Sequence, residues 1–266
     1  MHRRTRFEAG SGAKPGPRSI GLPALVAVAV LAGAVPAAVG AASAGAAPTA
    51  PKGQPVGCVA RGDSYRESGW RGSRKVALTF DGGPTSQYTA SVLHRLAKAK
   101  VHSTFFIRGA FIKGHAALLR RELREGHELA NHSWTHPHFP NSYELSRTSK
   151  AIRAATGFTP CLFRAPYGSV NGGLFSRARQ QGMLTIGWDV DSWDSLYDNV
   201  SKETVYSRVV NNVRPGSIIL MHDGEGPHQG TLQALGPILK ALKRKRLYPV
   251  TVSELLGLKT KYAKAR

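Results

Sequence analysis

The stretch "VALTFDGGPTSQYT" (residues 76–89) runs from apolar residues to a single carboxylate, Asp81, and then to two glycines and a proline. A short apolar run that ends in Gly and Pro is typical of a buried strand followed by a turn. The residues near 86–99 then take on helical spacing of their apolar positions. The stretch therefore predicts a strand–loop–helix unit with an acid at the carboxyl end of the strand.

The same alternation continues along the chain. The expected strands cover residues 75–80, 103–108, 127–132, 161–165, 184–190, 217–222 and 249–252, and helical patterns lie near 86–99, 115–125, 142–155, 172–181, 201–213 and 231–245. This order indicates parallel strands joined by right-handed crossovers, in either an open doubly wound sheet or a barrel. Because about 190 residues is short for eight such units, we expect a closed or nearly closed barrel of seven.

Three segments flank this expected domain, residues 74–258. Residues 1–47 have a basic start, an apolar stretch and small residues, the order of a secretory signal peptide. An uncleaved membrane anchor is the alternative. Residues 48–73 indicate a linker or N-terminal arm, and residues 259–266 a basic tail. After cleavage we expect a secreted or cell-wall-associated protein with no stable membrane span.

Cysteine content and charge suggest where the protein works. In an exported protein the two cysteines, Cys58 and Cys161, are expected to form one disulfide, with two buried free thiols as the alternative. A formal net charge of +21 favours attraction to polyanions such as anionic cell-wall polymers. The basic residues are spread along the chain and form no recognition module, so no specific nucleic-acid partner is expected.

Polar residues stand at the carboxyl ends of five expected strands, where the functional loops of parallel α/β proteins gather. They are Asp81, His132 with His136, Arg164 with Tyr167, Asp191 with Trp193, and His222.

These residue types suggest a hydrolytic site. His132 and His136 can present two imidazoles to one divalent cation, typically zinc. A metal with an open coordination position polarises a carbonyl group and lowers the pKa of bound water. Asp81 can then act as general base and His222 as general acid.

Three further residues have expected supporting tasks. Arg164 would orient the Asp81 carboxylate through a charge-assisted pair. Asp191 would hydrogen-bond the His222 ring and set its tautomer. Trp193 would form a pocket wall or a sugar platform, with plain core filling as the alternative.

Five motifs, in order across residues 75–256, resemble those of the NodB-homology polysaccharide deacetylases, also called carbohydrate esterase family four. They are TFDGGP (79–84) for TFDDGP, HSWTH (132–136) for H-[ST]-x-x-H, RAPYG (164–168) for R-x-P-Y-G, DSWDS (191–195) for D-x-x-D-W without the final tryptophan, and LMH (220–222) for L-x-H. The resemblance implies a distorted (β/α)7 barrel that hydrolyses N- or O-acetyl groups of polysaccharides such as peptidoglycan, chitin oligomers or acetylated xylan.

The resemblance also implies a role for each matching residue. Asp81 would be the catalytic base held by Arg164, and His132 and His136 would be metal ligands.

On the other side of the site, the backbone N–H of Tyr167 would stabilise the oxyanion. Asp191 would tune the general acid His222, and Trp193 and Leu220 would line the pocket for the acetate methyl group.

One position departs from the family pattern. The family's third metal ligand is the acid after the catalytic aspartate, and here that residue is Gly82. Water or Asp81 itself can fill the vacancy around a more weakly held ion, or another residue such as His138 or Asp223 can supply a ligand. Alternatively, the site holds no metal and the protein binds glycan without cleaving it.

Two functions therefore compete. Because the other four motifs keep their catalytic side chains, we expect a deacetylase that uses a divalent metal, zinc or cobalt. A non-catalytic cell-wall glycan-binding protein is the alternative, since Gly82 and Ser195 both replace residues of the family pattern.

Overall fold

The computed structural model describes residues 53–62 and 64–262. The expected signal peptide, residues 1–47, lies outside the described residues. The described elements follow one another as β1 (Pro55–Val59), β2 (Tyr65–Arg66), β3 (Lys75–Asp81), α1 (Thr89–Ala99), β4 (Thr104–Ile107), η1 (Gly109–Phe111), α2 (Ala116–Arg124), β5 (Glu128–Asn131), α3 (Ser142–Thr156), β6 (Leu162–Phe163), η2 (Pro166–Gly168), α4 (Gly172–Gln180), β7 (Leu184–Ile186), β8 (Val190–Asp191), α5 (Lys202–Asn212), β9 (Ile218–His222), α6 (Gln229–Arg244), β10 (Tyr248–Pro249), α7 (Val252–Leu255) and β11 (Lys259–Tyr262).

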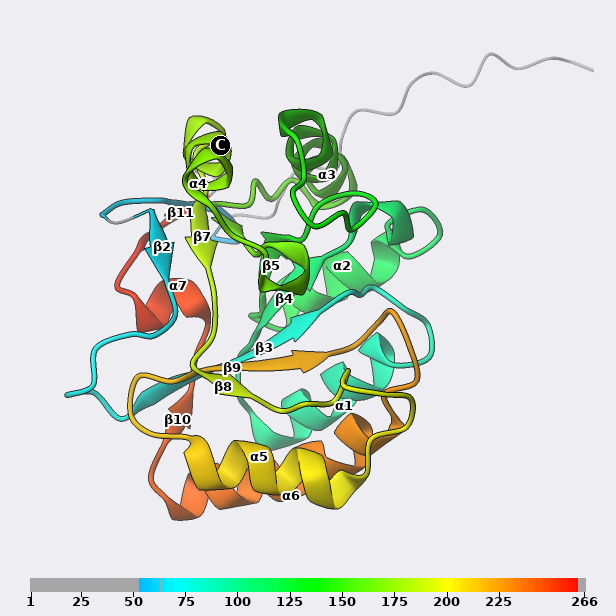
Figure 1. The fold of residues 1–266 in the computed structure, drawn as a ribbon, viewed down its shortest axis with the longest axis vertical. Coiled ribbons are helices and arrows are strands. Elements are labelled where there is room, and N and C mark those ends of the chain that lie inside the picture. The colour runs from blue at the N-terminus through cyan, green and yellow to red at the C-terminus, as the bar shows by residue number, and fades with distance from the viewer. Residues whose placement is uncertain (1–52, 63, 263–266) are drawn as a thin grey trace, which may run out of the picture. The chain divides into compact units, whose positions relative to one another are not determined.

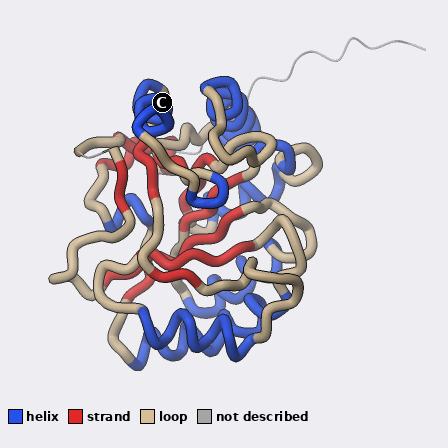
Figure 2. Tube along the Cα trace, viewed as in Figure 1, coloured by secondary structure: helices blue, strands red, loops and turns tan. Residues whose placement is uncertain are grey.

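Nine of the strands form one parallel sheet, which curls into a distorted barrel (Figure 1). The order along the sheet is β2–β7–β6–β5–β4–β3–β9–β8, and β10 pairs with the first residues of β3. Helices alternate with the strands, as the sequence predicts, and Figure 2 shows them outside the sheet. The expected α/β architecture of the distorted (β/α)7 type is thereby confirmed.

The distortion arises where one expected strand, residues 184–190, is broken into β7 and β8. The first piece pairs with β6, whereas the second pairs with β9 at the opposite end of the sheet. Residues 187–189 therefore carry the chain across the gap between the two ends, which no strand ladder closes in the described residues. A Cβ at Gly187 would overlap the hydroxyl group of Tyr65, so the glycine lets that side chain pack close to the crossing.

Side chains alternate between the two faces of β3, and this alternation aims the acid inward. Val76, Leu78 and Phe80 belong to the core cluster that the sheet shares with helices such as α1 and α6. Thr79 and Asp81, one residue out of step, point to the inside of the barrel instead.

Strand β9 follows the same rule. Ile219 and Met221 join the helix-facing core, while Leu220 and His222 alternate with them and face inward. Figure 1 shows α5 and α6 side by side beneath the sheet, with α1 next to them. The helices thus cover the outer face and leave the carboxyl-end rim to polar side chains.

Local sequence signals set several helix ends. The side chain of Asn141 accepts a hydrogen bond from Glu144 N at the start of α3, and Gly157 ends that helix in the left-handed region at φ 79°. Ser201 caps α5 in the same way through Thr204 N. These residues match the preferred caps of helix starts and stops.

The described parts of residues 48–73 and 259–266 are more ordered than the sequence indicates. In the expected arm, β1 forms a two-stranded antiparallel sheet with β11, whose residues were expected to be a tail. Neither strand shows clear alternation, and they lie at opposite ends of the chain, so the pairing had no local signal. None of the helices among the described residues combines the length and apolar character needed to cross a membrane.

The disulfide between Cys58 and Cys161 is present, as expected, and joins β1 to the start of β6. It spans 103 residues, so it restricts a large part of the unfolded chain. We predict that the double variant C58S/C161S loses about 2–5 kcal/mol of unfolding free energy in denaturant titrations. Reductant should lower the stability of the natural chain to the same level and leave the double variant unchanged. Equal stability of both proteins in the absence of reductant would contradict this account.

Candidate active site

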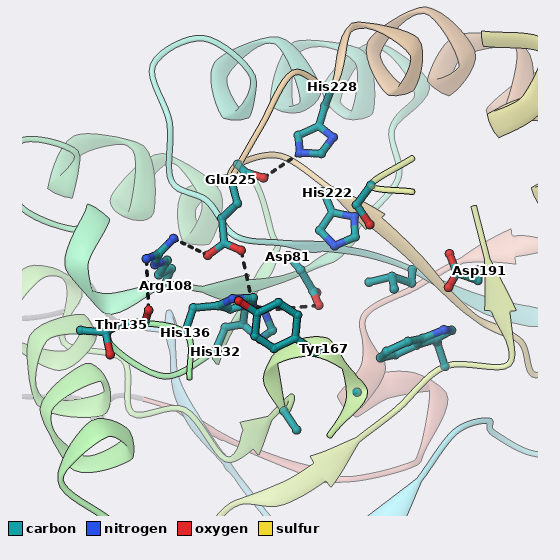
Figure 3. Close-up of a pocket in the computed structure, with 16 residues that line it drawn as sticks. Asp81, Arg108, His132, Thr135, His136, Tyr167, Asp191, His222, Glu225 and His228 are labelled. Carbon is teal, nitrogen blue, oxygen red and sulfur yellow. Dashed lines mark hydrogen bonds and ion pairs between the residues drawn. The ribbon is translucent and has the colours of Figure 1, made fainter. Parts of the chain in front are cut away.

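A cavity of about 600 Å³ opens at the carboxyl ends of the central strands (Figure 3). Seven of the residues expected at the site line it, namely Asp81, His132, His136, Tyr167, Asp191, Leu220 and His222. Arg164 lies fully buried behind Asp81, and Trp193 is not one of the lining residues. The topology therefore gathers most of the expected residues at one rim.

A buried ion pair fixes Asp81. Arg164 donates from Nη1 to Asp81 Oδ1 at 2.7 Å and to Thr79 Oγ1 at 2.8 Å. Both residues of the pair are almost fully buried. Burial raises the pKa of Asp81, and the charge of Arg164 opposes that rise by favouring the carboxylate. The other oxygen, Oδ2, lies 3.8 Å from His132 Nε2 on the cavity side.

Arg164 also stabilises the break between β7 and β8. Its Nε donates to the carbonyl oxygen of Ile186 at 3.3 Å and its Nη2 to that of Gly187 at 3.0 Å. The guanidinium stacks over the Phe106 ring, with Cζ 4.0 Å from the ring centroid. The expected Arg164–Asp81 pair is thus observed, and the same side chain satisfies backbone groups at the distortion.

The two expected metal ligands face each other across the cavity floor. His132 Nε2 and His136 Nε2 are 3.1 Å apart. Burial lowers the pKa of each imidazole to about 3, so both rings are neutral at pH 7. His132 Nδ1 donates to the carbonyl oxygen of Arg164 at 3.0 Å, which leaves the Nε2 lone pair facing the cavity.

The carboxylate that holds His222 is Asp194, and the expected contact with Asp191 is wrong. His222 Nδ1 lies 2.7 Å from Asp194 Oδ1, whose other oxygen accepts from His222 N and from Thr231 Oγ1. Asp191 instead accepts from the backbone N–H of Trp193 at 2.8 Å. The DSWDS motif contains two aspartates, Asp191 and Asp194, and the sequence does not distinguish them. Only the conformation of the loop decides which one contacts His222.

The charge of Asp194 governs the titration of His222. Burial acts to lower the pKa of this imidazole, but the ion pair with Asp194 outweighs it and raises the pKa to about 9. Burial likewise acts to raise the pKa of Asp194, yet His222 and the hydrogen bonds lower it to about 2. His222 is therefore an imidazolium near neutral pH.

The apolar wall differs from the one expected. Trp188, together with Leu220, lines the cavity. Trp193 is instead 41% exposed, and its ring stacks on Arg208, whose Cζ is 3.5 Å from the ring centroid. Tyr167 lines the opening in a left-handed conformation with φ 58°. Its ring packs against His136 with centroids 4.5 Å apart.

Neither residue that was expected as a substitute metal ligand faces the histidine pair. The carboxylate of Asp223 accepts from Gly83 N at 3.1 Å and from Thr89 Oγ1 at 2.5 Å, which fixes the loop after β3. His138 Nδ1 lies 2.9 Å from Ser169 Oγ, and its ring stacks on Tyr167.

Glu225, a residue that the sequence did not single out, does face the pair. Its Oε2 lies 3.3 Å from His136 Nε2, and its Oε1 accepts from Arg108 Nη1 at 2.8 Å (Figure 3). His228 was also missed, and its ring stacks on His222 with centroids 5.4 Å apart. Both lie in the loop "DGEGPHQG", where the acid and histidine after the L-x-H motif are the only sequence hint.

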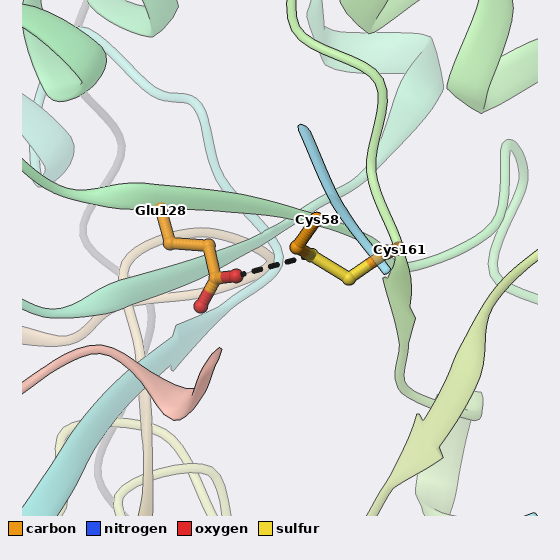
Figure 4. Close-up of side chains that lie close together, drawn as sticks. All are labelled: Cys58, Glu128 and Cys161. Atoms are coloured by element: carbon orange, nitrogen blue, oxygen red, sulfur yellow. Dashed lines mark hydrogen bonds between the residues drawn. A yellow bond between two sulfur atoms is a disulfide. The ribbon is translucent and has the colours of Figure 1, made fainter. Parts of the chain in front are cut away.

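A second cluster, Cys58, Glu128 and Cys161, brings potential ligand atoms together away from the cavity (Figure 4). Both sulfur atoms belong to the disulfide, so neither is a thiolate that can bind metal. The Glu128 oxygens accept from the hydroxyl groups of Ser253 and Thr104. This cluster is structural.

Sequence comparison identifies relatives of known activity. A family model described as polysaccharide deacetylase matches residues 69–186. A peptidoglycan-N-acetylglucosamine deacetylase, PgdA of Listeria monocytogenes, is 36% identical over 198 residues, which are 72% of this chain. The chain spans about two fifths of that relative, 41% of its length.

Solved structures agree with this match. The Bc1960 peptidoglycan N-acetylglucosamine deacetylase, in complex with a hydroxamate-type benzamide, superposes with a TM-score of 0.70 at 31% identity and covers 73% of this chain and 93% of its own. BA3943 of Bacillus anthracis, described as a CE4 family pseudoenzyme, has a TM-score of 0.66 at 28% identity, with 72% and 68% covered.

The buried pair generates a stability prediction. R164M would leave Asp81 buried without a counter-charge and two carbonyl groups without donors, so unfolding free energy should fall by about 3–5 kcal/mol. The matched variant R153M, at an exposed position of α3, should change it by no more than about 0.5 kcal/mol. Denaturant unfolding followed by tryptophan fluorescence measures both. A loss for R164M no larger than for R153M would contradict the assigned role.

Proposed function

The chain belongs to the polysaccharide deacetylase family, and from this premise we propose that it hydrolyses acetyl groups on glycans by metal-assisted acid/base catalysis. One observation carries the proposal. Asp81 and His222 are register partners on the neighbouring strands β3 and β9 and line the same cavity. Each is held by its own buried partner of opposite charge, Arg164 or Asp194. A base and an acid held side by side suit the hydrolysis of an acyl bond.

Peptidoglycan is the substrate that the comparisons favour. PgdA and Bc1960 are both described as acting on its N-acetylglucosamine. The expected signal peptide and the strongly positive charge, +21 for the full sequence with the signal peptide included, support a protein that works outside the cell against an anionic wall. Chitin oligomers and acetylated xylan present the same acetyl group and serve as alternative test substrates.

The histidine pair fits a divalent cation. Two nitrogens bound to one tetrahedral zinc ion lie about 3.3 Å apart, and the two Nε2 atoms here are 3.1 Å apart. His132 and His136 would hold the ion, either zinc or cobalt. When bound, it would polarise the acetyl carbonyl and acidify a water molecule.

Asp81 at the end of β3 and His222 at the end of β9 carry out the proton transfers. Asp81 takes a proton from the attacking water, while Arg164 holds the carboxylate in position through Oδ1. His222 donates its proton to the leaving nitrogen as the carbon–nitrogen bond breaks, which releases acetate and the free amine. Asp194, on the far side of the ring, keeps that proton available at neutral pH.

The remaining side chains shape the pocket. We assign the backbone N–H of Tyr167 to the oxyanion and Leu220 to the acetate methyl group. Trp188, which lines the cavity, takes the wall position that the sequence suggested for Trp193. Asp191 faces the cavity and holds the backbone of the loop through Trp193 N.

The alternative function is glycan binding without cleavage. Gly82 removes one expected ligand, and BA3943, a structural neighbour, is described as a pseudoenzyme. This alternative predicts binding of glycan oligomers with no acetate release under any metal supplementation.

A pH profile tests the acid/base assignment. If protonated His222 is the acid, kcat/KM for acetate release should fall as pH rises through the pKa of this group, raised to about 9. Asp194 contributes most to this rise, Asp81 and Glu225 add to it, and the His228 ring stacks alongside. In D194N the falling limb should move toward about 6.5, the ordinary pKa of histidine.

Two variants complete this experiment. H222A should abolish acetate release at every pH, and D198N, which removes an exposed carboxylate from the same loop, should keep the natural profile. Two results would exclude His222 as the acid. One is a pH profile of D194N whose falling limb stays near the pH of the natural chain, and the other is acetate release by H222A.

A further inference from the structure

The space beside Gly82 is already occupied by another residue. A Cβ added to Gly82 would lie 2.9 Å from Glu225 Cγ and 3.0 Å from the carbonyl oxygen of Gly224. The stem of Glu225 therefore fills the region in which the family's second acid would begin. Gly82 itself has φ 87°, a conformation that favours glycine.

The carboxylate of Glu225 ends beside the histidine pair. Its Oε2 lies 3.3 Å from His136 Nε2, which in turn lies 3.1 Å from His132 Nε2. The two imidazole nitrogens and the carboxylate oxygen are the donor atoms that zinc and cobalt prefer in proteins. Among the described residues, Glu225 is the carboxylate that an ion pair joins to His136.

Glu225 is held in this position from the opposite side. Arg108 Nη1 donates to Oε1 at 2.8 Å, and Nη2 of the same guanidinium donates to the carbonyl oxygen of Thr135 at 3.1 Å. The backbone N–H of Arg108 donates to Gly83 O at 2.9 Å, so the anchor is tied to the loop that contains Gly82. One oxygen of Glu225 is thus engaged by Arg108 while the other faces His136.

The backbone of Glu225 indicates the same placement. Its φ of 68° lies in the left-handed region, which few non-glycine residues adopt without a supporting environment. The side chain is also mostly buried, at 16% exposure, although it carries a carboxylate. A mostly buried acid on a residue with a left-handed backbone, with one oxygen beside His136, is typical of a functional ligand.

We propose that Glu225 is the third protein ligand of the metal site and replaces, from the loop after β9, the acid missing at Gly82. The inference rests on the proposed metal-assisted function and names the residue that completes its site. The proposal predicts that an acidic side chain at position 82 and the side chain of Glu225 cannot both fit in this space. This accounts for the glycine at position 82 of the TFDGGP motif.

Metal affinity tests the proposal directly. Protein stripped with chelator is titrated with Zn²⁺ by calorimetry and with Co²⁺ by visible absorption. In E225Q, which keeps the size of the side chain, the Kd for Zn²⁺ should rise at least about tenfold, the loss that even an outer-shell substitution produces. E203Q, an exposed carboxylate of α5, should bind as the natural chain does. H136A should also lose affinity, which places the ion at the histidine pair.

Several results would overturn the proposal. They are a Kd for E225Q equal to that of E203Q, full affinity in H136A, or no binding of Zn²⁺ or Co²⁺ by the natural chain. Circular dichroism melting of E225Q and E203Q separates a ligand effect from loss of fold.

Acetate release, measured on the same samples, keeps the two proposals apart. Release by the natural chain with unchanged affinity in E225Q rejects the ligand but not the deacetylase. Weakened affinity in E225Q without release by the natural chain rejects the deacetylase but not the ligand.

Discussion

The fold and the site both depend on the buried guanidinium of Arg164. It pairs with Asp81 at 2.7 Å and donates to the carbonyl oxygens of Ile186 and Gly187, where β7 separates from β8. Without Arg164, the break in the barrel would leave these two carbonyl groups without hydrogen-bond donors. The buried carboxylate of Asp81 would also lack a counter-charge. One side chain meets both needs. The break in the barrel and the position of the Asp81 carboxylate are therefore both stabilised by the same guanidinium.

The rest of the site follows from strand alternation around that centre. Asp81 and His222 end the adjacent strands β3 and β9 in register, and both lie on the inward face because their neighbours pack against the helices. Their environments then separate their roles. Arg164 favours the carboxylate of Asp81, while Asp194 holds His222 as an imidazolium. Two titratable groups with opposed partners, side by side in one cavity, are the arrangement on which the proposed acid/base catalysis rests.

Much of this could be predicted from sequence, and the failures have physical causes. The apolar runs located the central strands of the barrel, because burial on both faces leaves a local signal, whereas β2 lies in residues that were expected to form a linker or arm. The break at Gly187 left none, so residues 184–190 were expected to form one strand. Asp191 was chosen over Asp194, because only loop conformation decides which acid of DSWDS meets His222. Glu225 was missed since its contact with His136 joins residues 89 positions apart on separate loops.

The most direct test of the account is acetate release from N-acetylglucosamine oligomers and peptidoglycan by protein stripped with chelator and then resupplied with Zn²⁺ or Co²⁺. The account predicts little release from the stripped protein and recovery on addition of metal, because His132, His136, Asp81 and His222 line one cavity despite Gly82. Binding of these glycans without acetate release under any supplementation, with acetylxylan also left intact, would contradict it.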